Sequence, residues 1–150
     1  MRALIVSDIH SNLEALQAVM ADAVERGGFD VIWCLGDIVG YGPDPGACMD
    51  LLRSHSLKAV AGNHDRAALD LRDSADFNNA AAFSAQWTAE QLSAGERDFL
   101  SGLPQVEICD EFTLVHGSLR APLREYLLNE EAAVATFGRL TTRMCLVGHS

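Results

Sequence analysis

The chain has 150 residues and a formal net charge of −10, with 49% hydrophobic and 21% charged residues. This length suits one domain that buries roughly two-thirds of its unfolded surface, and the composition is ordinary for a globular protein. The acidic balance, with no cluster of Lys or Arg, argues against non-specific nucleic-acid binding and against electrostatic attachment to a membrane. No apolar stretch approaches the roughly 20 residues of a transmembrane helix.

Cysteine usage indicates the compartment. The four cysteines, Cys34, Cys48, Cys109 and Cys145, show no CxxC spacing, and three of the four lie in apolar strand patterns. We interpret them as reduced, buried thiols, which predicts a cytoplasmic protein. The first apolar run is interrupted by Asp8, so we expect no signal peptide.

The first half of the chain alternates predicted strands and helices. Short apolar runs predict strands at residues 2–7, 31–35 and 57–61. Helices between them serve as crossovers, so the β-α-β-α-β order implies parallel strands.

Capping signals mark the two helices of this half. Ser11 and Glu14 have the S-x-x-E form of a capping box, and Gly27 is a natural stop for the helix that follows. We expect Asp44 to be the N-cap of the next helix, with Pro45 at its first position and an end near residue 54.

The second half begins with a helical region and departs from parallel order. We expect residues 66–103 to be wholly helical, including a helix over 78–92 and a second capping box at Ser93 and Glu96. The remaining expected elements are an antiparallel hairpin of 106–108 with 112–115, a helix over 130–140 and a strand over 144–147.

Each of the apolar runs of residues 2–7, 31–35, 57–61, 112–115 and 144–147 ends in residues that can bind a metal. These residues are Asp8, His10, Asp37, Asn63, His64, Asp65, His116 and His149. Gly36 lets the backbone turn so that Asp37 projects from the carboxyl end of its strand, where open α/β sheets usually bind ligands. Five such strand ends predict a single site.

These ligand types favour hard or borderline divalent ions. One set contains Asp8, His10 and Asp37, and a second set contains Asn63, His116 and His149. No Cys joins them, which argues against a thiolate zinc site. The two oxygens of Asp37 suit a bridge between two cations, which together can clamp a phosphate.

The motifs D-x-H at residues 8–10, G-D at 36–37, G-N-H-D at 62–65, H-G at 116–117 and G-H at 148–149 occur in one order along the chain. Together they resemble the five-block signature of the calcineurin-like metallophosphoesterases. Residues 7–12, the loop 40–45 and the helix around Trp87 are most similar to the compact bacterial phosphodiesterase branch. The resemblance implies an α/β fold, a mixed-sheet sandwich flanked by helices, in a single domain over residues 1–150.

The resemblance also implies roles. Asp8, His10 and Asp37 would hold one divalent ion, and Asp37, Asn63, His116 and His149 would hold a second. The ions would be Mn, Fe, Zn or Ni, and a hydroxide bridging them would attack a small phosphoester, more readily a diester than a monoester. His64 would lie off the metals and stabilise the transition state or protonate the leaving oxygen. Asp65 would orient His64 or cap the next helix.

One departure concerns the last block. The family's motif is G-H-x-H, whereas this chain ends at Ser150, one residue after His149. We therefore expect a domain that lacks the family's final strands, with a weak first metal site. The sheet edge left exposed would favour self-association.

Other interpretations remain open. The competing function is a catalytically weak or inactive metal-binding or interaction module of the same fold. Asp8 and Asp37 each precede a helix, so either one alone is compatible with a simple N-cap. Gly40-x-Gly42 lacks the third glycine of a dinucleotide fingerprint, and Ser118 lacks a G-x-S-x-G elbow.

Several side chains near the metal blocks are candidates for substrate contact. Tyr41 and Tyr126 could line a pocket, whereas Trp87, in an Ala-rich segment, is favoured as a core residue. Arg66 and Arg120 follow metal blocks closely and are candidates for binding phosphate.

Overall fold

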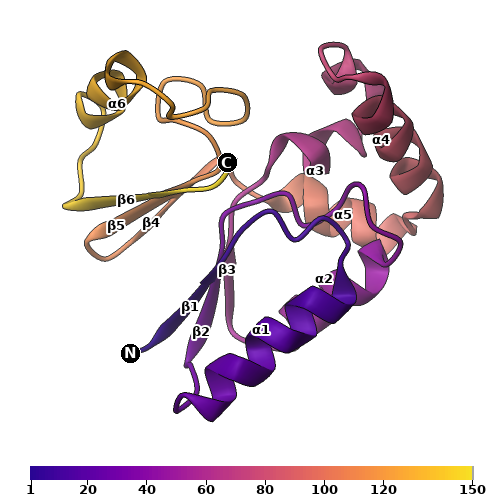
Figure 1. Ribbon diagram of the computed structural model, residues 1–150, viewed down its shortest axis with the longest axis horizontal. Coiled ribbons are helices and arrows are strands. Elements are labelled where there is room, and N and C mark those ends of the chain that lie inside the picture. The colour runs from indigo at the N-terminus through magenta and orange to yellow at the C-terminus, as the bar shows by residue number, and fades with distance from the viewer. Residues whose placement is uncertain (150) are drawn as a thin grey trace.

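Two three-stranded sheets form the centre of the molecule (Figure 1). The computed structural model describes residues 1–149; Ser150, where we predicted that the last motif breaks off, lies outside them. The first sheet is parallel and has the order β1 (Ala3–Val6), β2 (Val31–Cys34), β3 (Leu57–Ala59). In the second sheet, β5 (Phe112–Val115) pairs antiparallel with β4 (Val106–Cys109) and parallel with β6 (Met144–Val147).

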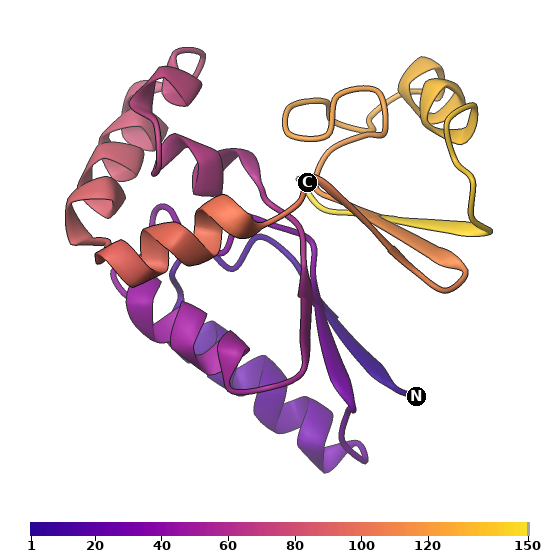
Figure 2. The same cartoon turned by 180° about the vertical axis from the view of Figure 1, so that it is seen from behind.

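Helices lie outside the sheets, as Figures 1 and 2 show. Their bounds are α1 (Leu13–Glu25), α2 (Pro45–Arg53), α3 (Asn63–Ala67), α4 (Asn79–Gln91), α5 (Ala94–Gly102) and α6 (Glu130–Phe137), with a short 3₁₀ turn at Leu71–Ser74. The expected α/β class, a mixed-sheet sandwich flanked by helices, is confirmed. Within residues 1–149, no helix is both long and apolar enough to cross a bilayer.

Alternate residues of β2 face two separate cores. Ile32 and Cys34 belong to the larger core, which they share with buried residues of α1, α2 and α5. Val31 and Trp33 belong to the smaller core, where they meet Leu114 of β5. The first sheet is therefore covered by helices on one face and by the second sheet on the other.

The predicted start of the first helix needs correction, whereas that of the second is confirmed. The N-cap of α1 is Asn12, whose side chain accepts the N–H of Ala15 at 3.0 Å, so the expected Ser11–Glu14 capping box is wrong. Ser11 cannot act as the N-cap of α1, because it is fully buried in a left-handed turn, with φ +54°. Asp44 is the N-cap of α2 and Pro45 is its first residue, as expected, although the Asp44 side chain makes no capping bond.

The region 66–103 is mostly helical but interrupted, because α3, the 3₁₀ turn, α4 and α5 are separate elements. α3 starts earlier than expected, at Asn63, since the Asp65 carboxylate accepts the N–H of Gly62 and caps this turn. The capping box at Ser93 and Glu96 is confirmed. β3 ends at Ala59 and α6 at Phe137, each earlier than expected.

Candidate metal centre

The candidate ligands lie in the segments that follow β1, β2, β3, β5 and β6, so distant parts of the sequence meet at one place. Four of these residues adopt the left-handed conformation that L-residues avoid: Asp8, His10, Asp37 and His149, with φ between 50° and 55°. Such strain costs about 1–3 kcal/mol per residue and is concentrated at functional sites. The surrounding structure thus holds these side chains in conformations that packing alone would not favour.

Gly36 makes the approach of the loops possible. Its φ is +94°, and a Cβ here would lie 2.9 Å from both the Cα of Gly62 and Nδ1 of His116. A side chain would therefore push the β3 loop and His116 away from Asp37.

Two groups of side chains bring their ligand atoms within 4.8 Å of one another. The first cluster is Asp8, His10 and Asp37, and the second cluster is Asp37, His116 and His149. Asp37 belongs to both.

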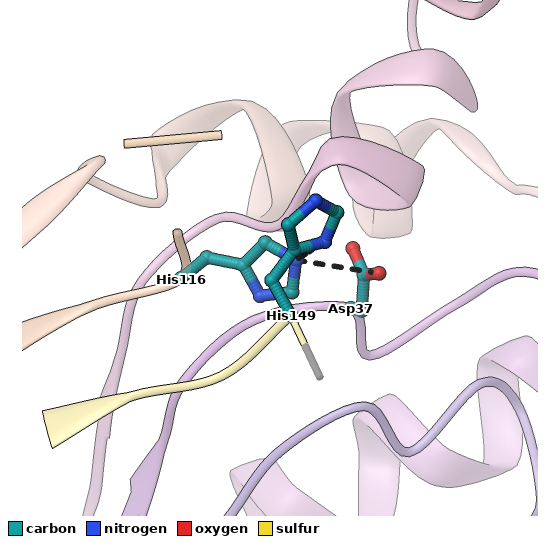
Figure 3. Close-up of side chains that lie close together, drawn as sticks. All are labelled: Asp37, His116 and His149. Atoms are coloured by element: carbon teal, nitrogen blue, oxygen red, sulfur yellow. Dashed lines mark hydrogen bonds and ion pairs between the residues drawn. The ribbon is translucent and has the colours of Figure 1, made fainter. Parts of the chain in front are cut away.

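Asp37 is almost fully buried, at 2% exposure. Its Oδ1 accepts the backbone N–H of His64 at 2.9 Å. Its Oδ2 lies 3.4 Å from Nε2 of His116 (Figure 3) and 3.7 Å from Nε2 of His10. Burial opposes ionisation of Asp37, but the hydrogen bond to His116 and the nearby imidazoles keep its pKa below the ordinary value.

Backbone carbonyls orient two of the imidazoles. Nδ1 of His116 donates to the carbonyl of Leu35 at 2.8 Å, and Nδ1 of His10 donates to that of Val39 at 3.2 Å. Because a carbonyl only accepts, each Nδ1 carries the proton, and each Nε2 presents a lone pair toward Asp37 when the ring is neutral. This arrangement is the usual outer support of a metal-binding histidine.

The side chain of Asn63 completes the second cluster. Nε2 of His116 lies 3.0 Å from Oδ1 of Asn63 and 3.1 Å from Nδ1 of His149. Burial opposes protonation of His116, yet the bond to Asp37 raises its pKa; burial lowers the pKa of His149. Several acceptor atoms thus converge on Nε2 of His116, which carries no proton when the ring is neutral, and these ligand atoms fit a divalent cation.

His64 lies beside both clusters and belongs to neither. Its ring centre is 4.7 Å from that of Tyr41 and 4.6 Å from that of Phe77, and burial lowers its pKa. Nδ1 of His64 is buried and has no hydrogen-bond partner within residues 1–149.

Asp65 holds the loops together instead of contacting the His64 ring. Its carboxylate accepts the N–H groups of Asp37, Val39 and Gly62 at 2.9–3.1 Å. Burial and the Asp37 carboxylate raise the pKa of Asp65, and the backbone donors oppose that shift.

A cavity of about 150 Å³ opens over the two clusters, and both His64 and Tyr41 line it. A second cavity of about 210 Å³ adjoins it and is lined by Phe77, Arg124 and Tyr126, among others. Tyr126 stacks on the ring of His149, with the ring centres 3.8 Å apart. Tyr41 and Tyr126 each line both cavities, and their contact with a substrate stays a prediction.

The expected arginines lie elsewhere. The guanidinium of Arg66 donates to the carbonyls of Ser101 and Leu103, and Arg120 forms ion pairs with Glu125 and Glu131. Neither lines the two cavities.

Arg124 lines the larger cavity instead, where Asp73 and Asp76 pair with it. Sequence reasoning missed Arg124 because it belongs to no motif, and only folding brings its loop beside residues 73–78. Trp87, favoured as a core residue, is only half-buried and lines a surface groove.

Comparison with known proteins agrees with this geometry. The profile of the calcineurin-like phosphoesterase family matches residues 1–141, so the chain belongs to that family. The crystal structure of a metallophosphoesterase from Sphaerobacter thermophilus superposes with a TM-score of 0.86 and 45% identity, covering 99% of this chain and 60% of that one.

Two sequence relatives extend the comparison. An uncharacterized protein of Methanocaldococcus jannaschii is 43% identical over 68% of this chain and 42% of its own length. A symmetrical bis(5'-nucleosyl)-tetraphosphatase of Psychromonas ingrahamii is 37% identical over 43% of this chain and 24% of its own length. The chain spans less than half the length of either relative.

Proposed function

We propose that this protein is a metal-dependent phosphoesterase that prefers diesters to monoesters. The observation that carries the proposal is the position of Asp37, whose Oδ2 lies between His10 of the first cluster and His116 of the second. Family membership supports phosphoester hydrolysis as the reaction class.

Each cluster supplies ligands to one divalent ion. Asp8, His10 and Asp37 would hold the first ion, and Asp37, Asn63, His116 and His149 would hold the second. Mn, Fe, Zn and Ni all suit this mixture of oxygen and nitrogen ligands. When bound, such cations neutralise phosphate oxygens and supply an activated water.

His64 acts on the substrate instead of holding an ion. Its ring lines both cavities and lies outside both ligand clusters. It is therefore free to donate a proton to the leaving oxygen or to stabilise charge on the phosphate. The Asp37 carboxylate fixes it from the backbone side, through the bond from the His64 N–H.

Space on two sides of the site supports a diester substrate. The cavity lined by Phe77 and Arg124 adjoins the metal centre on one side, and a groove beyond Tyr41 adjoins it on another. A diester carries two substituents on its phosphate, whereas a monoester fills only one of these spaces.

The test compares bis(4-nitrophenyl) phosphate with 4-nitrophenyl phosphate, which share a leaving group. Each of the four metals is added in turn, and a chelated sample is the control. We expect metal-dependent hydrolysis with kcat/KM roughly tenfold or more higher for the diester. A higher kcat/KM for the monoester would reject the diester preference. No hydrolysis with any metal would favour the competing interaction module.

A further inference from the structure

The groove of about 410 Å³ beyond Tyr41 lies next to the metal centre, and the function proposed above assigns no particular chemical group to it. It runs between the loop at residues 41–43 and the face of α4 that carries Phe83, Ser84 and Trp87. Phe83 is 72% exposed and Tyr41 is 53% exposed, although both are large and largely apolar. No charged side chain of the described chain lines this groove.

The groove is fixed to the metal centre. The Tyr41 N–H donates to Oγ of Ser84, which ties the loop to α4, and the N–H of Gly42 donates to the carbonyl of His10 at 2.9 Å. The Tyr41 ring centre lies 4.9 Å from that of His10 and 4.7 Å from that of His64. One side chain thus separates the groove from the cavity over the ligand clusters and lines both.

The chemistry of the groove selects a flat, uncharged group with a polar edge. Phe83 and Trp87 stand one helical turn apart on α4, so they lie on the same face. Exposed aromatic rings offer a stacking surface. The Ser84 hydroxyl accepts the Tyr41 N–H, which leaves its hydrogen available to donate. An alkyl chain would fill the groove without using this donor, whereas the edge of a heteroaromatic base can accept from it.

We propose that this groove binds the base of a nucleoside phosphoester whose phosphate lies at the metal centre. The inference rests on the proposed phosphoesterase function, because a phosphate held by the clusters is what brings the base past Tyr41. The substrate class is then nucleoside phosphodiesters, with the base between Tyr41 and the aromatic side chains of α4.

The test measures binding separately from catalysis. Adenosine 5'-monophosphate and ribose 5-phosphate share the phosphate and sugar and differ only in the base. Each is titrated into the metal-loaded chain while tryptophan fluorescence is followed. We expect adenosine 5'-monophosphate to bind roughly tenfold more tightly, as base stacking allows, and to quench the fluorescence. Trp87→Phe should lose the quenching, because the other tryptophan, Trp33, is buried between the sheets.

Variants of an exposed side chain locate the effect without threatening the fold. Phe83→Ala should weaken adenosine 5'-monophosphate binding roughly tenfold and leave ribose 5-phosphate unchanged, whereas Phe83→Trp should retain the preference. Phe137→Ala is the matched control, since Phe137 is also a helical phenylalanine and 69% exposed. Phe137→Ala should change the affinity for neither ligand.

Three outcomes would overturn the inference. The first is that the two ligands bind equally or that neither binds. The second is that Phe83→Ala leaves the affinity for adenosine 5'-monophosphate unchanged. The third is that Phe83→Ala changes the oligomeric state while nucleotide binding stays intact. The last would assign the groove to a second copy of the chain. Hydrolysis of bis(4-nitrophenyl) phosphate by the same sample separates the two proposals. Normal hydrolysis with no preference for the base would reject only the proposal that the groove binds a base. Base-dependent quenching without hydrolysis would reject only the proposed phosphoesterase activity.

Discussion

The two ligand clusters differ in where their residues come from and in how deeply they lie. The residues of the first cluster all follow strands of the parallel sheet, and Asp8 and His10 are only partly buried. The second cluster joins Asp37 of the parallel sheet to His116 and His149 of the mixed sheet, and all three are buried. The first cluster therefore requires only that β1 and β2 pair correctly, whereas the second also requires the two sheets to dock.

The comparison shows how one residue can link two sites of unequal character. Asp37 is the single member common to both clusters, and its backbone and side chain are held by Asp65 and by the His64 N–H. Substitution of Asp37 should affect both clusters, whereas substitution of any other ligand should affect only the cluster to which that ligand belongs.

The largest effect is expected from Asp37→Ala. This change removes the shared carboxylate, so the protein should lose most of its bound metal and all metal-dependent hydrolysis. Asn63→Ala should weaken mainly the binding of one of the two ions. Metal content per chain, measured by elemental mass spectrometry, gives the result for each variant. Near-normal occupancy of two ions in Asp37→Ala would remove the basis for a shared ligand.

His64→Ala should slow turnover by about 10²–10⁴ while metal content stays normal, because His64 is proposed to act on the substrate and not on the ions. The loss should be smaller for a substrate with an acidic leaving group, which needs no proton. An equal loss for good and poor leaving groups would limit His64 to charge stabilisation. Loss of metal would instead make it a ligand.

The third prediction concerns the docking of the sheets. His116→Ala deletes a buried ring and its hydrogen bond to the carbonyl of Leu35. In the presence of a chelator, it should therefore lower the free energy of unfolding by roughly 2–4 kcal/mol. His10→Ala, at a partly exposed position in the first cluster, should cost less. Metal should raise the unfolding temperature of His10→Ala more than that of His116→Ala, since only the second cluster joins the sheets. Thermal unfolding with and without metal measures both effects, and equal shifts would contradict the distinction.

The smallest effect separates two arginines of one loop. Arg124→Gln should raise KM for a phosphodiester roughly three- to fivefold, because Arg124 lines the cavity of about 210 Å³ beside the metal centre. Arg120→Gln should leave KM unchanged, since Arg120 pairs with Glu125 and Glu131 away from that cavity. A larger change in Arg120→Gln would restore the role predicted for it from its place in the sequence.

The sequence was informative where short-range patterns decide the structure. Apolar runs gave the order of the strands, and the residues after them gave six candidate ligands. Five of these make up the two clusters, namely Asp8, His10, Asp37, His116 and His149, and the sixth, Asn63, lies 3.0 Å from His116. The hairpin of β4 and β5 and the capping box at Ser93 were also readable, because turn and cap chemistry act over a few residues. Whether these ligands hold metal stays a prediction.

Tertiary packing decided the rest. Asn12 and not Ser11 caps α1, because the turn that carries the candidate ligands buries Ser11. Both residue types are good N-caps, so the local sequence does not distinguish them. Arg124 lines the cavity and Arg66 does not, because segments distant in sequence hold their guanidinium groups: residues 73–78 for Arg124 and residues 101–103 for Arg66. The aromatic groove exists because the loop after β2 meets α4, two segments about 40 residues apart. Spacing along the chain determines which residues stand at a strand end, but only the packing of distant segments determines which of their polar and aromatic groups come to share one cavity.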